Sequence, residues 1–108
     1  MVKTPFENLP QKYKDLVSVL RTGSENALSS AEIMQITGIS GRDTGAITAD
    51  LIANHGYLIG ASRKLPFGYY IIETEDDLQS TLRSLNNELQ GILNRHQALN
   101  RNFYAGQQ

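Results

Sequence analysis

The chain has 108 residues and a formal net charge of -1, with 40% hydrophobic and 19% charged residues. These values are typical of one globular domain and exclude a disordered chain, and they lack the basic excess of many nucleic-acid-binding domains. The absence of cysteine excludes disulfides, cysteine-based zinc sites and thiol nucleophiles.

The first predicted helix follows an irregular arm at residues 1–8. Apolar residues recur at helical spacing from Leu9 to Leu20, and Pro10 suits the first turn of a helix. We therefore expect a helix from about Pro10 to Arg21, with Gly23 marking its end.

A second helix is predicted from a capping box. Ser29 stands three residues before Glu32, which is the spacing at which the two side chains cap each other's backbone amides. Ile33 and Ile36 are then expected on the apolar face of this helix, and Gly38 ends it.

A third helix is predicted to begin at Ser40, with Asp43 at the capping position, and to run to about Asn54 or His55 before Gly56. At ~100° per residue its two sides separate clearly. The side expected in the core carries Thr44, Ile47, Thr48, Leu51 and Ile52. The opposite side carries Arg42, Asp43, Ala46, Ala49, Asp50 and Ala53.

A β-hairpin is predicted after this helix. The β-prone runs 57–62 and 69–73 are separated by RKLPFG, a segment with the Pro and Gly of a turn. Residues 27–28 could add a short third strand. Phe67 at the tip is expected to pack back onto the domain.

The last predicted element is a long helix that follows a capping signal at residues 74–77 and runs to about Asn102. Its apolar positions alternate at spacings of four and three, as in a coiled coil. They are Leu78, Leu82, Leu85, Leu89, Ile92, His96, Leu99 and Phe103.

This helix would be ~40 Å long at ~1.5 Å per residue, whereas a domain of this size is only ~30 Å across. Its second half therefore needs a partner, and we expect a homodimer, with the two helices parallel or antiparallel. The alternative is that the first two heptads fold back onto the first helix. His96 is expected to be a polar core residue that sets the register.

The order of these elements is that of a winged helix-turn-helix. LSSAEIMQITGISGRDTGAITADLIANHGYLIG resembles the helix-turn-helix of winged-helix regulators, and the resemblance covers roughly Leu16 to Ile72. The segment YLIGASRKLPFGYYIIETEDDLQSTLRSLNNEL is similar to small winged-helix proteins of bacteriophages and prophages. The expected fold is mainly α with a small β-hairpin: a winged helix-turn-helix domain at 1–73, then a C-terminal oligomerisation helix and tail at 74–108.

The resemblance implies sequence-specific or structural binding of double-stranded DNA, in phage gene regulation or replication. The start of the third helix would lie in the major groove, and the hairpin along the phosphate backbone or in a minor groove. The implied DNA-contacting residues are Ser40, Arg42, Asp43, Thr44, Ala46, Ser62, Arg63 and Lys64. Thr44 also falls on the expected core side. Asp43 and Asp50 would repel phosphates unless they are paired. Since residues 40–72 carry only three basic residues against these two, a single copy would bind weakly and a dimer would double the contacts.

No catalytic constellation is present, so we expect neither an enzyme nor a bound metal or cofactor. The glycines at 38, 41 and 45 lack the GK[ST] of a phosphate-binding loop, and the acidic residues at 73–77 suit a helix N-terminus. An alternative function is a protein-interaction module of a replication or packaging complex, with the winged domain as scaffold and the long helix as docking surface. The near-neutral charge and the two aspartates of the third helix favour this alternative.

The expected location is the cytoplasm of a bacterium or of a phage-infected host. No apolar run approaches the ~20 residues of a membrane span, so no membrane partner is expected. The segment MVKTPFENLP lacks the apolar region of a secretory signal.

Overall fold

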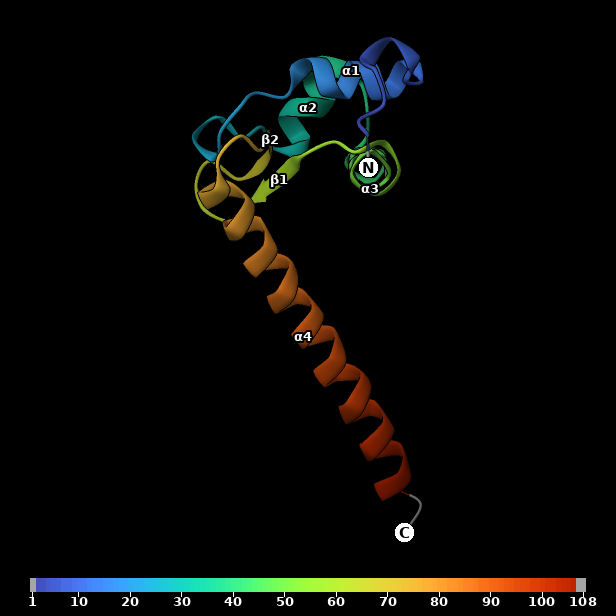
Figure 1. The fold of residues 1–108 in the computed structure, drawn as a ribbon. Helices are drawn as coiled ribbons and strands as arrows, with labels where there is room; N and C mark the ends of the chain where they lie inside the picture. The colour runs from blue at the N-terminus through green and yellow to red at the C-terminus, as the bar shows by residue number, and fades with distance from the viewer. Residues whose placement is uncertain (1, 107–108) are drawn as a thin grey trace.

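The computed structural model describes residues 2–106 and is mainly helical, with one two-stranded antiparallel hairpin and a long C-terminal helix (Figure 1). Among these residues, no helix is long and apolar enough to cross a membrane. The elements, in chain order, are η1 (Phe6–Asn8), α1 (Gln11–Val19), η2 (Ser24–Asn26), α2 (Ser30–Thr37), α3 (Gly41–His55), β1 (Ile59–Ser62), β2 (Gly68–Ile71) and α4 (Glu75–Ala105).

The helix α1 is shorter than predicted. Pro10 is its N-cap and Leu20 already has extended backbone angles, so the helix ends before Arg21. Gly23, with a φ of 90°, precedes the short turn η2 and does not end α1. The chain leaves the helix early because Thr22 pairs with Ile71 of β2 as a parallel bridge.

The helix α2 begins with the predicted capping box. The Ser29 hydroxyl accepts a hydrogen bond from the Glu32 amide, and the Glu32 carboxylate accepts one from the Ser29 amide, each at 3.1 Å. Gly38 ends the helix with a φ of 79°, as predicted. Ile33 is fully buried but Ile36 is exposed, so the two do not share one buried face as expected. Only the Ile33 face of this short helix meets the core.

The helix α3 has the predicted bounds, from the N-cap Ser40 to the C-cap Gly56, although the capping side chain is that of Ser40 rather than that of Asp43. The Ser40 hydroxyl accepts a hydrogen bond from the Asp43 amide at 3.1 Å. The side facing the core consists of Thr44, Ile47, Thr48 and Leu51. Ile52 was predicted to belong to this side but is exposed.

The hairpin pairs Ile59 with Ile71 and Ser62 with Gly68, and β1 starts two residues later than predicted. The predicted third strand is present as a single antiparallel bridge between Leu28 and Tyr69, whose amides and carbonyls exchange hydrogen bonds of 2.8 and 2.9 Å. Gly68 permits this approach, because a side chain there would collide with the Leu28 carbonyl.

Two apolar clusters hold the fold together. The larger one joins the three short helices to the hairpin and consists of Leu9, Leu16, Leu20, Leu28, Ile33, Ile39, Ile47, Leu51, Tyr57 and Ile59. The smaller one consists of Ala27, Tyr70 and Ile72, with Leu78 of α4 packed against it. The second cluster therefore attaches the start of α4 to the hairpin.

The helix α4 leaves this helical domain and runs far beyond it (Figure 1). The molecule measures 59 × 31 × 28 Å, and no residue of α4 is buried. Thr74 caps the helix by accepting a hydrogen bond from the Asp77 amide, as predicted. The alternative in which two heptads of this helix fold back onto α1 is wrong, since α4 contacts the hairpin instead.

Candidate functional site

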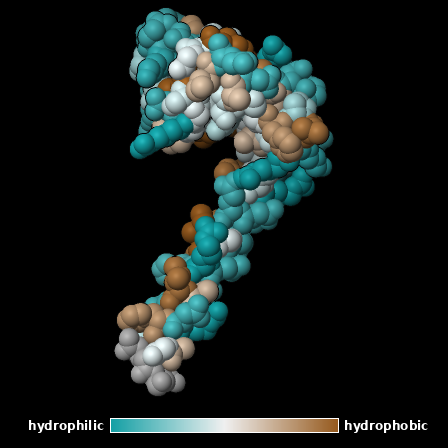
Figure 2. Space-filling model, turned by 180° about the vertical axis from the view of Figure 1, so that it is seen from behind, coloured by the Kyte–Doolittle hydropathy of each residue, from teal (hydrophilic) through white to brown (hydrophobic). Residues whose placement is uncertain are grey.

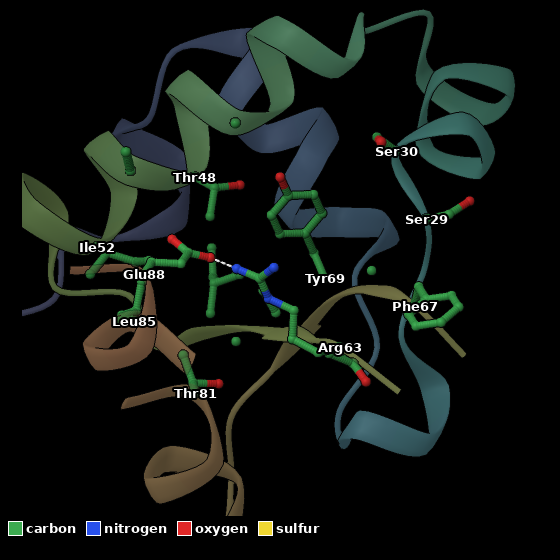
Figure 3. A pocket seen from close by; sticks show the side chains of 17 residues that line it. Ser29, Ser30, Thr48, Ile52, Arg63, Phe67, Tyr69, Thr81, Leu85 and Glu88 are labelled. Atoms are coloured by element: carbon green, nitrogen blue, oxygen red, sulfur yellow. Dashed lines mark ion pairs between the residues drawn. The ribbon is translucent and has the colours of Figure 1, made fainter. Parts of the chain in front are cut away.

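A groove of about 610 Å³ lies between α3 and the hairpin, with α4 along its third side (Figure 3). From α3 it is lined by Thr48, Ala49 and Ile52, and from the hairpin by Arg63 and Tyr69. Its α4 side is formed by Thr81, Leu85 and Glu88. Three consecutive parts of the chain, α3, the hairpin and α4, thus share one concave surface.

The outward face of α3 beside this groove is made of small side chains. Ala46, Ala49 and Ala53 are exposed, and Arg42 is exposed at the start of the helix. Thr44 is fully buried, so its side chain cannot reach a ligand outside the domain. This corrects the prediction that Thr44 contacts DNA, in favour of its place on the core side.

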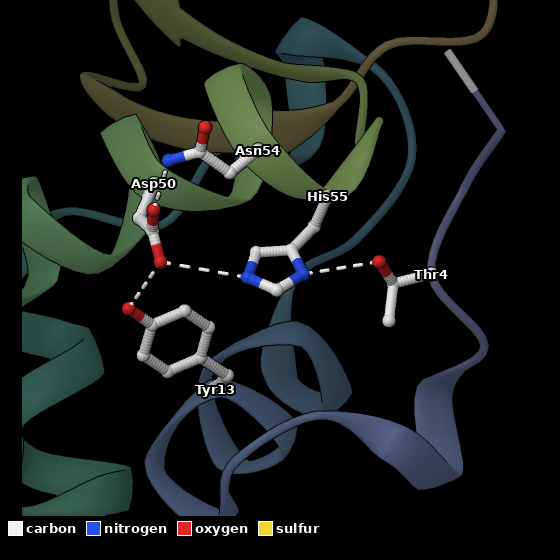
Figure 4. A network of polar contacts seen from close by, with 5 residues as sticks. All are labelled: Thr4, Tyr13, Asp50, Asn54 and His55. Carbon is white, nitrogen blue, oxygen red and sulfur yellow. Dashed lines mark hydrogen bonds and ion pairs between the residues drawn. The ribbon is translucent and has the colours of Figure 1, made fainter.

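Asp50 does not face outward, contrary to the helical projection (Figure 4). Its carboxylate accepts hydrogen bonds from the Tyr13 hydroxyl at 2.6 Å and from the Asn54 amide at 2.5 Å. His55 Nε2 lies 3.5 Å from the same carboxylate, and His55 Nδ1 lies 3.0 Å from the Thr4 hydroxyl.

This network keeps the Asp50 charge against α1. The Tyr13 and Asn54 hydrogen bonds and then the nearby His55 hold the pKa of Asp50 below its usual value, and the bond to Asp50 raises the pKa of Tyr13. Helical spacing alone places Asp50 on the exposed face, because it does not show that α1 lies beside this part of α3. One of the two charges expected to repel phosphates is therefore engaged elsewhere.

Asp43, the other acidic residue of this helix, has a basic neighbour. Lys12 Nζ of α1 lies 3.7 Å from the Asp43 carboxylate, and both side chains are more than half exposed. Such a pair contributes only ~0–1 kcal/mol to stability, but it offsets the negative charge locally. Among residues 2–106, Arg42 forms no ion pair.

The two basic residues of the hairpin tip differ in their surroundings. Arg63 forms an ion pair with Glu88 of α4, across the groove edge (Figure 3). Lys64 is exposed and has no ion pair within the described part of the chain. The Ser62 hydroxyl donates to the Lys64 carbonyl at 2.8 Å and accepts from its amide at 3.3 Å, so it shapes the turn. Phe67 lines the groove but is 54% exposed, which is less packing than predicted.

The contribution of α4 to the groove was missed by the sequence analysis. Leu85 was assigned to dimerisation alone, and Glu88 was assigned no role. No local signal links Glu88 to Arg63, because the two lie on separate elements and meet only once α4 is placed against the hairpin.

The apolar stripe of α4 is largely solvent-exposed (Figure 2). Leu78 is the exception, since it is half-buried against the domain. The prediction that Leu78 belongs to the free stripe is therefore wrong. The exposed fraction ranges from 46% at Leu82 to 72% at Leu99. The other exposed members are Leu85, Leu89, Ile92, His96 and Phe103, with Leu93 beside them.

The arrangement combines an exposed helix face of alanines, an arginine at its start, a lysine at the neighbouring hairpin tip and a long apolar stripe. Within residues 2–106, no three or more His, Cys, Asp or Glu side chains are grouped so that they would hold a metal ion. In comparisons with known proteins, no family model matches the chain, and no curated protein and no solved structure matches it.

Proposed function

We propose that the chain is a winged helix-turn-helix protein that binds double-stranded DNA as a homodimer, without enzymatic activity, in phage gene regulation or replication. The observation that carries this proposal is the exposed face of α3. It is lined by alanines, Asp43 beside it is paired with Lys12, and Asp50 is held against α1 by Tyr13. The order of elements supports it, including the bridge between Leu28 and Tyr69 that adds a third strand to the hairpin.

In this proposal α3 enters the major groove. Ala46, Ala49 and Ala53 let the helix backbone approach the base edges closely, and Arg42 reaches a guanine or a phosphate from the first turn. Ser40 and Asp43 lie at the same end, where the Asp43 amide donates to the Ser40 hydroxyl of the helix cap and the Asp43 carboxylate pairs with Lys12.

The hairpin tip lies along the phosphate backbone. Lys64 is the principal contact, because Arg63 is already paired with Glu88. If Arg42 and Lys64 each neutralise one phosphate, a dimer makes about four such contacts. The logarithm of the binding constant then falls with the logarithm of the salt concentration with a slope of about -3.6.

The α4 stripe holds the two copies together. Its side chains are more exposed than is usual for leucines of a folded domain, and a second apolar helix would bury them. Dimerisation doubles the number of phosphate contacts, which a single copy with few basic residues needs for binding at physiological salt.

Fluorescence anisotropy of a labelled DNA duplex tests the proposal at ~50 mM and ~200 mM salt. We expect Arg42→Ala and Lys64→Ala each to weaken binding and to reduce the salt slope by about 1 per contact in each copy. Arg101→Ala is the matched control, because it removes the same charge at the far end of α4. Failure of the unmodified protein to bind any duplex at 50 mM salt would end this proposal.

A second candidate function is a protein-interaction module. The groove favours it, since Ile52, Phe67 and Leu85 give it an apolar lining that a phosphate backbone does not need. In that case Ile52→Glu abolishes binding to the partner, whereas Lys64→Ala leaves it unchanged. If the protein binds DNA instead, Lys64→Ala weakens binding to the duplex.

A further inference from the structure

We propose that α4 pairs with α4 of a second copy in antiparallel orientation, with Leu82 opposite Leu99 of that copy, and that both grooves then open on the same face of the dimer. The inference rests on the proposed self-association through α4. It does not depend on DNA binding.

The stripe itself fits this register. The apolar residues of a coiled-coil helix fall into two series, the a and the d positions of the heptad. In a pair of antiparallel helices, each a residue faces a d residue of the other helix. The first series is Leu82, Leu89, His96 and Phe103, and the second is Leu78, Leu85, Ile92 and Leu99. Placing Leu82 opposite Leu99 puts Leu85 opposite His96 and Leu89 opposite Ile92, so every stripe position from Leu82 to Leu99 is paired in one register. Phe103 then lies opposite Leu78.

The charges beside the stripe distinguish the two orientations. Glu88 and Arg95 occupy the same flanking position in successive heptads. In the antiparallel register this position faces its own kind, so Arg95 of the second copy lies beside Glu88. The Glu88 carboxylate then stands between Arg63 of its own chain and this Arg95, and the contact occurs twice. In a parallel pair Glu88 faces Leu93, Arg95 faces Asn100 and no ion pair forms. A parallel pair also places His96 against His96.

The apolar surface is also covered more completely by the antiparallel pair. The exposed Phe103 and Tyr104 rings pack edge to face, with centroids 5.3 Å apart, at the free end of α4. In the antiparallel register this end lies opposite Leu78, beside the domain to which Leu78 attaches α4. In a parallel pair the rings meet only each other.

The two-fold axis of such a pair is perpendicular to both helices and passes close to Gly91, midway between Leu82 and Leu99. Rotation about this axis leaves each face of the pair on its own side. The groove opens on the side of α4 that carries Thr81 and Glu88, so both grooves open on one face.

The spacing of the two domains follows from the same register. From Leu78 to the axis is ~19 Å at ~1.5 Å per residue, so the two points of attachment lie ~38 Å apart. This approximates the ~34–36 Å helical turn that separates two major-groove half-sites.

Disulfide cross-linking tests the orientation directly, because the chain has no cysteine of its own. Leu82→Cys and Leu99→Cys, carried on chains of different length, are mixed and oxidised. Both positions are exposed in a single copy, and circular dichroism checks that the helices are retained. The antiparallel register gives the mixed disulfide between unlike chains. Disulfides only between like chains would show parallel pairing and overturn the proposal.

The charge pairs provide an independent test. Glu88→Arg and Arg95→Glu each place two repulsive pairs in their own antiparallel dimer, and we expect each to weaken self-association roughly tenfold. An equal mixture of the two variants forms mixed dimers preferentially, because both pairs then become attractive. Arg101→Glu is the control for the change in net charge, since it lies away from the stripe. Equal weakening by Arg101→Glu and Arg95→Glu would refute the register.

Sedimentation of the unmodified protein separates this inference from the proposed function. A monomer at ~100 μM refutes both the register and the dimeric part of the proposed function. A dimer with the mixed disulfide but without affinity for duplex DNA supports the register and refutes the DNA-binding proposal alone.

Discussion

Replacement of Thr44 by valine exchanges a buried hydroxyl for a methyl group of similar size. Thr44 is fully buried, and its Oγ1 has no hydrogen-bond partner among the described residues. A buried hydroxyl without a partner costs ~1–3 kcal/mol of desolvation, and the methyl group removes this cost. Part of the gain is lost to imperfect fit, so we expect the free energy of unfolding to rise by about 1 kcal/mol.

Thr37→Val is the matched control, because the same exchange there removes a satisfied hydroxyl. The Thr37 hydroxyl donates to the Ile33 carbonyl at 2.7 Å and accepts from the Ile39 amide at 3.1 Å. Losing these bonds is expected to lower the free energy of unfolding by about 1–2 kcal/mol. The two variants should therefore shift stability in opposite directions.

Urea unfolding followed by circular dichroism measures both variants, at one protein concentration because a dimer's stability depends on it. For a domain of this size, 1 kcal/mol corresponds to a shift of roughly 4–8 °C in the melting temperature. Thr44→Val should also leave DNA affinity unchanged. Equal destabilisation by Thr44→Val and Thr37→Val would refute the reasoning, as would a loss of DNA affinity in the stable Thr44→Val variant.

Asp50→Asn should lower the free energy of unfolding at pH 7 and make it depend less on pH in the acidic range. The pKa of Asp50 is lowered in the folded protein, so its stabilising contribution is present above the unfolded pKa of ~3.9 and is lost as pH falls through the folded pKa. The melting temperatures of the two proteins should therefore differ at pH 7 and converge as pH falls to 3. Gly68→Ala should cost about 2–3 kcal/mol, since φ is 137° and the new side chain meets the Leu28 carbonyl; an unchanged urea midpoint would contradict this. Gly91→Ala should instead stabilise α4 by about 1 kcal/mol, because the added carbon meets no close neighbour in the helix. On heating, the variant should retain more helicity than the unmodified protein.

The sequence predicts the order of elements well because their boundaries are set by local chemistry. Ser29, Ser40 and Thr74 each cap a helix through their own side chains. Gly38 and Gly56 end helices with positive φ values that other residues resist. These signals act over three or four residues and need no knowledge of the rest of the fold.

The site is harder to predict because it depends on contacts between distant segments. Periodicity placed Asp50 outside and Ile52 inside, since it cannot show which sector of a helix its neighbours cover. The bond from Tyr13 to Asp50 and the ion pair between Arg63 and Glu88 both join residues on different elements. Only the packing of α1 and α4 brings these partners together.

Because α4 is attached to the domain in its first half only, the long helix can rotate about that attachment. It is fixed at Leu78, which packs against the cluster of Ala27, Tyr70 and Ile72. The Arg63–Glu88 pair joins it to the hairpin tip ~15 Å farther along. The free end at Phe103 lies ~38 Å from Leu78 at ~1.5 Å per residue. A sideways displacement of ~5 Å at that end corresponds to ~2 Å at Glu88. A displacement of the far end of α4 is therefore passed to the hairpin tip, on a smaller scale, through the Arg63–Glu88 pair.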